Sequence, residues 1–283
     1  MIKKILGFLI LVILTIATYL SDVQNGSDVF VHQNIFDSQN EDIQKTVVSF
    51  IDVSQGDSSL IVTGSQAILI DGGRNADETN VCEYIESQGV KSIDLIIATH
   101  PHEDHIGGLD AVMEKFDVYQ ILMPDVPYNT KTYEDVITSA NENGTEIIYP
   151  DDYYAFEFES GLTIKVLTHP AEFESSNVNN DSVVCRVEIG ETSILYTGDM
   201  EQELEVALLS QVEKADILKV GHHGSNTSST DDFLDRVSPS IAIISCGFEN
   251  SYGHPHVEVI DRLTIRGIEI LQTQYEGTIV FEF

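Results

Sequence analysis

The sequence predicts an α/β fold in which two packed β-sheets are flanked by helices. Short apolar runs closed by glycine-bearing turns, which are typical of strands, dominate both ends of the 283-residue chain. Longer stretches with helical periodicity separate these runs, and no segment repeats at the period of a solenoid. With 42% hydrophobic residues, the chain can bury the core that a layered fold requires.

The first 20 residues predict export from the cytoplasm. Lys3 and Lys4 precede an uncharged apolar run, Ile5–Leu20, as in a signal peptide. This run falls short of the ~20 residues that span a membrane, yet its best cleavage pattern, Thr15–Ala17, is poor. We therefore expect residues 1–20 to be either a cleaved signal peptide or an N-terminal membrane anchor. The protein would be secreted or membrane-anchored, and only this segment would contact the membrane.

The remaining residues are expected to form a flexible linker, 21–45, followed by one folded domain, 46–283. The linker is rich in Ser, Asp, Asn and Gln, whereas the apolar runs begin at Thr46. The predicted strands are Thr46–Val53, Ser59–Thr63, Ala67–Ile70, Ile93–Thr99, Tyr119–Met123, Glu146–Tyr149, Leu162–Thr168, Val183–Ile189, Ser193–Tyr196, Ile217–Val220, Ile241–Ser245, Glu269–Gln272 and Thr278–Phe283. The predicted helices are Asn75–Gln88, Ile106–Lys115, Tyr133–Asn141, Met200–Leu209, Thr230–Val237 and His256–Arg266.

The charge of the chain excludes one class of function. It has 14 Lys and Arg against 47 Asp and Glu, a net charge of -33, and the acidic residues are scattered along its whole length. Such a surface repels polyanions, so we expect no strong electrostatic binding of nucleic acid. A phosphate-bearing substrate would need a local cationic centre, which bound metal ions can supply.

The cysteines predict no disulfide framework. Cys82, Cys185 and Cys246 are odd in number and widely spaced, which also excludes a zinc-finger pattern. We expect three buried thiols, with one chance pair as the alternative.

A cluster of metal-ligand residues follows the predicted strand Ile93–Thr99. His100, His102, Asp104 and His105 lie within six residues on a Pro-containing turn, so their side chains can converge from one segment. Neutral imidazoles suit Zn²⁺ and similar divalent ions, and a carboxylate adds negative charge at a second ion. A polar surface loop is the competing explanation, but a buried strand before the cluster and Gly107–Gly108 behind it favour a metal site.

The segment Thr99–Gly108 resembles the His-x-His-x-Asp-His signature of the metallo-β-lactamase superfamily. Further blocks resemble, in order, those of the hydrolase domain of ComEC-type DNA-uptake competence proteins, over residues 46–283. These blocks are Asp52–Asp57, Ile68–Gly73, Asn180–Ser182, Tyr196–Asp199, Lys219–Ser225 and Tyr252–His256. The resemblance implies a four-layer αββα sandwich, two mixed sheets flanked by helices, with two metal ions at one edge.

The resemblance also implies a role for each ligand. His100 and His102 would hold the first ion, Asp104 and His105 the second, and Asp199 would bridge the two. His223 is our choice for the remaining ligand of the second ion. We expect two divalent ions, Zn²⁺ from the number of histidines, with Mn²⁺ as the alternative.

Other residues of these blocks are expected to face the substrate. Asp104 and His254 are the predicted catalytic residues, the latter as a phosphate contact or as the proton donor to the leaving group. His222, His254 and His256 are the predicted substrate-binding residues, although His256 is also placed to begin a helix. Lys219 is expected to support the site from below.

Two positions depart from the pattern of the family. Many members place a third histidine on the first ion, and His169 is the only candidate for it here; whether it completes that site stays open. Many ComEC-type domains carry an acidic residue where His102 stands, so this chain has the fuller ligand set.

The predicted function is that of a dinuclear metal-dependent hydrolase, a phosphodiesterase or nuclease-like enzyme acting outside the cytoplasm. A hydroxide held between the two ions would be the nucleophile. The expected partner is a small-molecule or cell-surface phosphodiester, with DNA as a further candidate. The alternatives are a phosphorylcholine-type esterase, a lactonase or a β-lactamase, and, from another class, a surface binding module that keeps metal only for stability.

Overall fold

The computed structural model describes residues 29–32, 45–150, 154–167, 169–170 and 172–283. The predicted export segment and most of the predicted linker lie outside the described residues. Within the range predicted as linker, Val29–His32 forms a strand, β1, which pairs in parallel with the strand β15 near the end of the chain. No helix in these described ranges combines the length and apolar character needed to cross a membrane.

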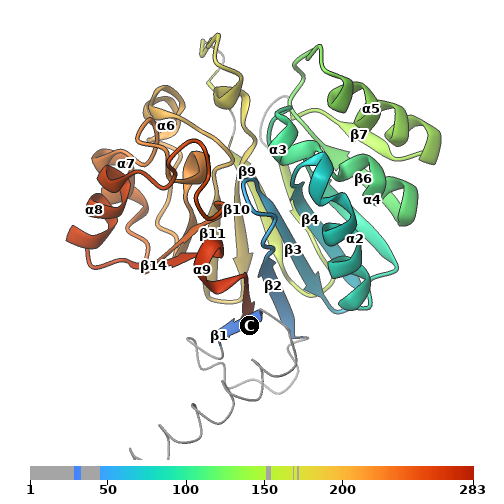
Figure 1. The fold of residues 1–283 in the computed structure, drawn as a ribbon, viewed down its shortest axis with the longest axis horizontal. Coiled ribbons are helices and arrows are strands. Elements are labelled where there is room, and N and C mark those ends of the chain that lie inside the picture. Colours follow the sequence, from blue (N-terminus) through green and yellow to red (C-terminus); the bar gives the residue numbers. More distant parts are fainter. Residues whose placement is uncertain (1–28, 33–44, 151–153, 168, 171) are drawn as a thin grey trace, which may run out of the picture.

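The described residues form two mixed sheets that pack face to face (Figure 1). In spatial order, the first sheet contains β1 (Val29–His32), β15 (Thr278–Glu282), β2 (Thr46–Phe50), β3 (Ser58–Thr63), β4 (Gln66–Gly72), β5 (Ser92–Ile97), β6 (Asp117–Leu122) and β7 (Glu146–Ile148). The second contains β14 (Glu269–Gln272), β13 (Ile241–Ile244), β12 (Ile217–Lys219), β11 (Thr192–Tyr196), β10 (Val184–Ile189), β9 (Thr163–Leu167) and β8 (Tyr154–Glu157).

Helices cover the outer face of each sheet and complete a four-layer αββα sandwich (Figure 1). The first sheet is covered by α2 (Glu78–Ser87), α4 (Leu109–Lys115) and α5 (Lys131–Asn143). The second is covered by α6 (Gln202–Leu208), α7 (Asp231–Val237) and α8 (Val257–Ile265). The fold class predicted from the sequence is therefore confirmed.

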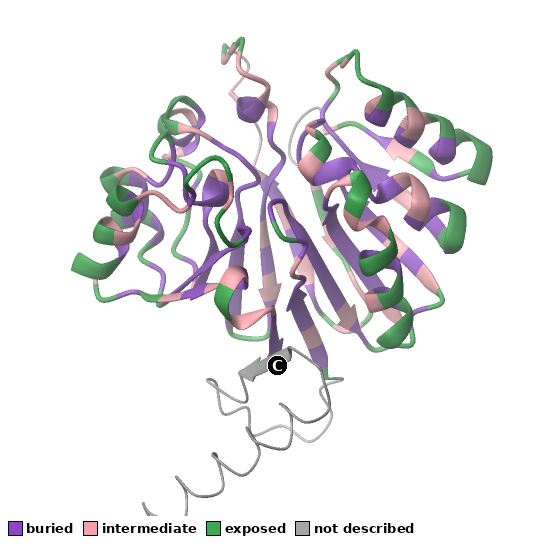
Figure 2. Cartoon of the chain, in the orientation of Figure 1, coloured by how far each residue is buried: buried purple, intermediate pink, exposed green. Residues whose placement is uncertain are grey.

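Strand alternation builds three apolar layers, which Figure 2 shows as buried bands along the strands and inner helix faces. In β4, Ile68 and Ile70 point into the layer between the sheets, whereas Leu69 points toward the helices on the outer face. Both faces of these strands are buried, so they appear in the sequence as continuous apolar runs. The third layer packs α6, α7 and α8 on the second sheet.

Besides the strand β1 in the predicted linker, the described structure differs from the predicted elements at three further places. The helix predicted over Ile106–Lys115 is divided into α3 (Glu103–Ile106) and α4, because Gly107 lies against the backbone of Arg74 and Asn75; a Cβ on Gly107 would come within 2.2 Å of the Asn75 nitrogen. The four-residue edge strand β8, with alternate residues exposed, was not predicted. Neither was the short helix α9 (Thr273–Glu276).

The cysteines are buried free thiols, as expected.

Candidate metal centre

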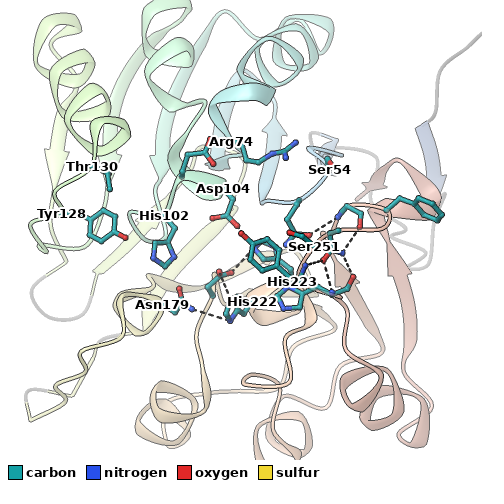
Figure 3. A pocket seen from close by; sticks show the side chains of 18 residues that line it. Ser54, Arg74, His102, Asp104, Tyr128, Thr130, Asn179, His222, His223 and Ser251 are labelled. Atoms are coloured by element: carbon teal, nitrogen blue, oxygen red, sulfur yellow. Dashed lines mark hydrogen bonds and ion pairs between the residues drawn. The ribbon is translucent and has the colours of Figure 1, made fainter.

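The predicted ligands converge at the edge where the parallel strands of both sheets end. His100 follows β5, Asp199 follows β11, and His223 lies in the short turn η3 (Gly221–Gly224) that follows β12. A cavity of about 660 Å³ opens at this edge, and His102, Asp104, His222 and His223 point toward its centre (Figure 3). Loops at the carboxyl ends of parallel strands are the usual place for a site in such folds.

The buried carboxylate of Asp199 lies at the middle of the site and faces imidazoles with both of its oxygens. Its Oδ1 is 3.1 Å from His105 Nε2 and 3.5 Å from His223 Nε2. Its Oδ2 is 3.7 Å from His100 Nε2 and 3.7 Å from His222 Nε2. Because each oxygen faces a different group of histidines, Asp199 has the geometry of a carboxylate that bridges two cations.

The first group of ligand atoms is formed by His100, His102 and Asp199. His100 Nε2 and His102 Nδ1 face each other at 3.0 Å, and both lie close enough to Asp199 to bind one ion together with it. Two lone-pair nitrogens at this separation repel each other unless a proton or a cation lies between them. The contact therefore fits an ion at this position.

In the second group, His105 and His223 each use Nδ1 to bond away from the centre. His105 Nδ1 is 2.8 Å from Asp71 Oδ2, and His223 Nδ1 donates to the carbonyl oxygen of Ser245 at 3.0 Å. Their Nε2 atoms then turn free lone pairs inward, the usual arrangement of metal-bound histidine. Both Nε2 atoms and Asp199 Oδ1 are buried without a hydrogen-bond partner, an arrangement that a metal ion would satisfy. Asp104 contributes Oδ2, 3.3 Å from His223 Nε2.

The turn η3 brings two consecutive histidines to the same carboxylate. His222 and His223 adopt left-handed backbone conformations, with φ of 50° and 53°. Such conformations cost free energy for residues with a Cβ and are concentrated at functional sites. His222 also places Nδ1 3.3 Å from Glu201 Oε1, so both of its ring nitrogens face carboxylates.

His254 lies on the cavity wall, whereas His256 does not. His254 is 9% exposed, and its Nδ1 is buried without a hydrogen-bond partner. His256 precedes α8, and its Nδ1 accepts a hydrogen bond from the Asn226 N–H at 2.9 Å. The rings of the two histidines are 4.9 Å apart.

His169 does not join the first group. Its Nε2 is 3.2 Å from the carbonyl oxygen of Ser182, and its ring lines a separate cavity of about 200 Å³ with Asp181 and Val183. Among the described residues, the groups suited to a metal ion do not include it.

Two buried carboxylates that the sequence interpretation left without a role support the ligands. Asp71 accepts hydrogen bonds from the Thr99 N–H and hydroxyl, at 2.8 and 2.7 Å, and orients His105. Asp57 pairs with Lys219 and places Oδ1 3.4 Å from His223 Nδ1. Asp57 also belongs to the second group of potential ligands. The only sequence signal for them was their position within the Asp52–Asp57 and Ile68–Gly73 blocks.

The electrostatics of the site favour positive charge at its centre. Burial by itself would raise the pKa of Asp199, but His105 and His223 outweigh it and hold that pKa well below its ordinary value. Burial would likewise lower the pKa of His223, but Asp199 and Asp57 raise it to about 10. Without metal, the centre therefore retains protons; bound cations would replace them.

The pKa of Asp57 also lies below its ordinary value. Burial opposes this shift, and Lys219 and His223 produce it. Burial raises the pKa of Asp71 in spite of His105. Burial, together with His223 and His222, lowers the pKa of His254 to about 4.

Residues 51–247 match the family model of the metallo-beta-lactamase superfamily. The chain belongs to the metallo-beta-lactamase superfamily. The match confirms the family predicted from the sequence, and the matched range contains both groups of candidate ligands around Asp199.

Within this superfamily, the chain is similar to competence proteins. It is 31% identical to ComE operon protein 3 of Bacillus subtilis over 256 residues, which cover 83% of this chain and 33% of that protein. It is 30% identical to competence protein ComA of Neisseria gonorrhoeae over 243 residues, 84% of this chain and 32% of that protein. The chain thus spans about a third of the length of these relatives.

Solved structures share the fold at low sequence identity. YhfI from Bacillus subtilis has a TM-score of 0.56 and 15% identity, covering 84% of this chain and all of that one. A diphosphatase from the PhnP family has a TM-score of 0.51 and 17% identity, covering 84% of this chain and 99% of that one. These neighbours establish the fold of the chain.

Proposed function

We propose that this metallo-beta-lactamase-fold chain is a phosphodiesterase that uses two divalent metal ions and acts outside the cytoplasm. The observation that carries the proposal is the division of the Asp199 carboxylate between two groups of imidazoles. We expect Zn²⁺ from the histidine-rich ligands, and Mn²⁺ is the alternative that the carboxylates would tolerate.

The two groups supply most of the ligands: His100 and His102 would hold the first ion, His105 and His223 the second, with Asp199 shared. Asp104 lies outside these groups, but its Oδ2 is 3.3 Å from His223 Nε2, and we assign it to the second ion. When bound, the two ions would supply the positive charge that attracts a phosphate and would acidify a water molecule for attack on phosphorus. This supply of charge matters in a chain whose own net charge is -33.

The side chains of the site have distinct tasks. The Asp71 carboxylate and the Ser245 carbonyl hold the rings of His105 and His223 in one orientation, so their inward nitrogens need not reorganise when a cation binds. His254, which lines the cavity with its ring 5.5 Å from the ring of His222, is placed to contact a phosphoryl oxygen or to pass a proton to the leaving oxygen.

Phosphate chemistry is favoured over lactam chemistry by two findings. The relatives at about 30% identity, which match most of this chain, are competence proteins, and DNA, the polymer of DNA uptake, is a phosphodiester. In addition, a diphosphatase of the PhnP family has the same fold, so the fold itself accommodates phosphate substrates. The location outside the cytoplasm rests on the apolar segment Ile5–Leu20 and on the competence relatives.

The test is metal analysis of the purified chain, followed by turnover on a panel of substrates. The panel contains bis-p-nitrophenyl phosphate, single-stranded DNA, a phosphocholine ester, a lactone and a β-lactam. We expect turnover of the phosphodiesters after loading with Zn²⁺ or Mn²⁺. Turnover of the lactone or lactam alone would overturn the proposal, and a fully loaded chain inactive on every substrate would favour a metal-stabilised binding module.

A further inference from the structure

The loop that follows β13 carries two exposed aromatic side chains beside the candidate metal centre. Phe248 is 66% exposed and Tyr252 is 64% exposed, and both line the cavity that contains His222 and His223. In Figure 3, Ser251 of the same loop lies near His222 and His223, whereas Tyr128 lies at the other end of the view. Exposed aromatic side chains at the rim of a functional cavity suggest contact with a ligand.

The backbone of this loop is held in place before any ligand binds. The amide nitrogen of Asn250 donates to the carbonyl oxygens of Gly247 and His254, at 2.9 and 2.5 Å. Its amide oxygen accepts from the N–H groups of Tyr252 and His254, at 3.1 and 3.0 Å. One side chain thus cross-links both ends of the loop, which reduces the ordering cost of binding.

The ring of Tyr252 links the loop to the chemistry of the site. It stacks on the ring of His254, with centroids 5.6 Å apart and planes inclined by 22°. Because most of Tyr252 is exposed, a planar group can stack on it next to the phosphate position. Phe248 adds a second open ring, packed edge-on against Tyr275 with centroids 6.4 Å apart.

The arrangement of the rings, and not the charge of the cavity, favours a planar ligand over a quaternary ammonium group. Among the described residues that line it, Arg74 is the only lysine or arginine. Its Nε and Nη2 bond to Asp77, at 2.7 and 3.2 Å, which holds the guanidinium at the wall. Glu103, Asp104 and Asp199 line the same cavity, so charge alone does not disfavour a quaternary ammonium group. The rings do, because Phe248 contacts Tyr275 and Tyr252 contacts His254 without a ring contact between Phe248 and Tyr252, unlike the several rings that enclose such a group in an aromatic cage.

We propose that Phe248 and Tyr252 form an aromatic ledge that binds a nucleobase attached to the phosphate held at the metal centre. This inference rests on the proposed phosphodiesterase function and assigns a subsite to it. Stacking a base on an aromatic side chain contributes about 1–3 kcal/mol and needs no basic track along a polyanion. The ledge therefore lets an acidic protein recognise the end of a strand, or a short nucleotide, by stacking.

Calorimetric titration of the metal-loaded chain with adenosine 5′-monophosphate and with methyl phosphate tests the ledge. Neither ligand is a diester, so neither is a substrate for the proposed reaction. We expect adenosine 5′-monophosphate to bind about tenfold or more tightly than methyl phosphate. In the double variant Phe248→Ala/Tyr252→Ala this preference should fall to about one- to threefold, whereas Phe248→Tyr/Tyr252→Phe, which keeps both rings, should retain it.

The matched control is Tyr119→Ala, which removes an exposed tyrosine, 57% exposed, on β6 outside the cavity. It should keep the full preference for the nucleotide. Equal affinities of the unaltered chain for the two ligands, or an undiminished preference in the double alanine variant, would overturn the ledge. So would tighter binding of phosphocholine than of the nucleotide.

Hydrolysis of bis-p-nitrophenyl phosphate by the same preparation separates the two proposals. Turnover without any preference for the nucleotide overturns the ledge and leaves the phosphodiesterase function standing. A preference that depends on the two rings, without turnover of any phosphodiester, supports the ledge as a nucleotide-binding site and overturns the enzymatic function.

Discussion

Lys219 and Asp57 form a buried ion pair, with Nζ 2.6 Å from Oδ2, that joins the two sheets beside the candidate metal centre. Asp57 lies just before β3 in the first sheet, and Lys219 ends β12 in the second. The other oxygen of Asp57 faces His223 Nδ1 at 3.4 Å. The pair thus connects the packing of the sandwich to the orientation of a ligand, and this gives Lys219 the supporting role expected from the sequence.

Replacing Lys219 with Met should destabilise the fold strongly. Removing one partner of a buried ion pair leaves the other charge uncompensated, at a cost of about 3–5 kcal/mol. The double variant Lys219→Met/Asp57→Asn removes the stranded charge and should recover a substantial part of this loss. Urea unfolding of the metal-free chain measures the stability of the single and the double variant. The control is Lys115→Met, which breaks the exposed ion pair with Glu86 and should change the stability little. A Lys219→Met variant as stable as the parent chain would show that the pair contributes nothing.

Asp199→Ala should abolish turnover and lower the metal content. Loss of the shared carboxylate removes a ligand from both groups, so we expect a fall from about two ions to one or fewer per chain. Elemental analysis of the dialysed protein measures this directly. Asp181→Ala, near His169 in the separate cavity, should retain the parent content. Full metal content in Asp199→Ala would refute the bridging assignment.

Asp71→Asn should weaken metal binding without disturbing the fold. Asp71 has a φ of 59°, and Asn tolerates this left-handed conformation, so the backbone needs no change. The amide bonds His105 Nδ1 more weakly than the carboxylate does, and loss of such a supporting carboxylate typically lowers metal affinity about 10–100-fold. Competition with a chelator measures the affinity, and thermal unfolding of the metal-free variant checks the fold. Unchanged affinity would show that the Thr99 contacts are the only function of Asp71.

The metal-free chain should lose stability as the pH rises from neutral toward 10. Folding raises the pKa of His223 from 6.5 to about 10, because Asp199 and Asp57 outweigh the effect of burial. A group whose pKa is raised by folding stabilises the folded state fully at pH values below its unfolded pKa. This stabilisation is lost as the pH rises through its folded pKa. Thermal unfolding between pH 6 and 10 should show this decline in the chelated protein. The metal-loaded protein should show little of it, since its histidines are unprotonated throughout. A flat profile for the chelated protein would contradict the prediction.

Much of the fold was predictable because the strands are short apolar runs between glycine-bearing turns. Strands such as β4 and β5, which are buried on both faces, were predicted from the sequence. The edge strand β8, in which alternate residues are exposed, was not. The division between α3 and α4 depends on the contact of Gly107 with the backbone near Asn75, and a contact between distant segments leaves no local signal.

The sequence by itself determined the residue types and their order: a cluster of ligands after one strand, an aspartate after another and a histidine pair after a third. Only the tertiary structure decided which atoms meet. It turned His105 and His223 by hydrogen bonds to Asp71 and Ser245, excluded His169, and brought Asp57 and Lys219 together from different sheets. The physical reason is that spacing along the chain constrains only neighbouring side chains. Sheet pairing and packing set the distances between residues that are far apart in sequence.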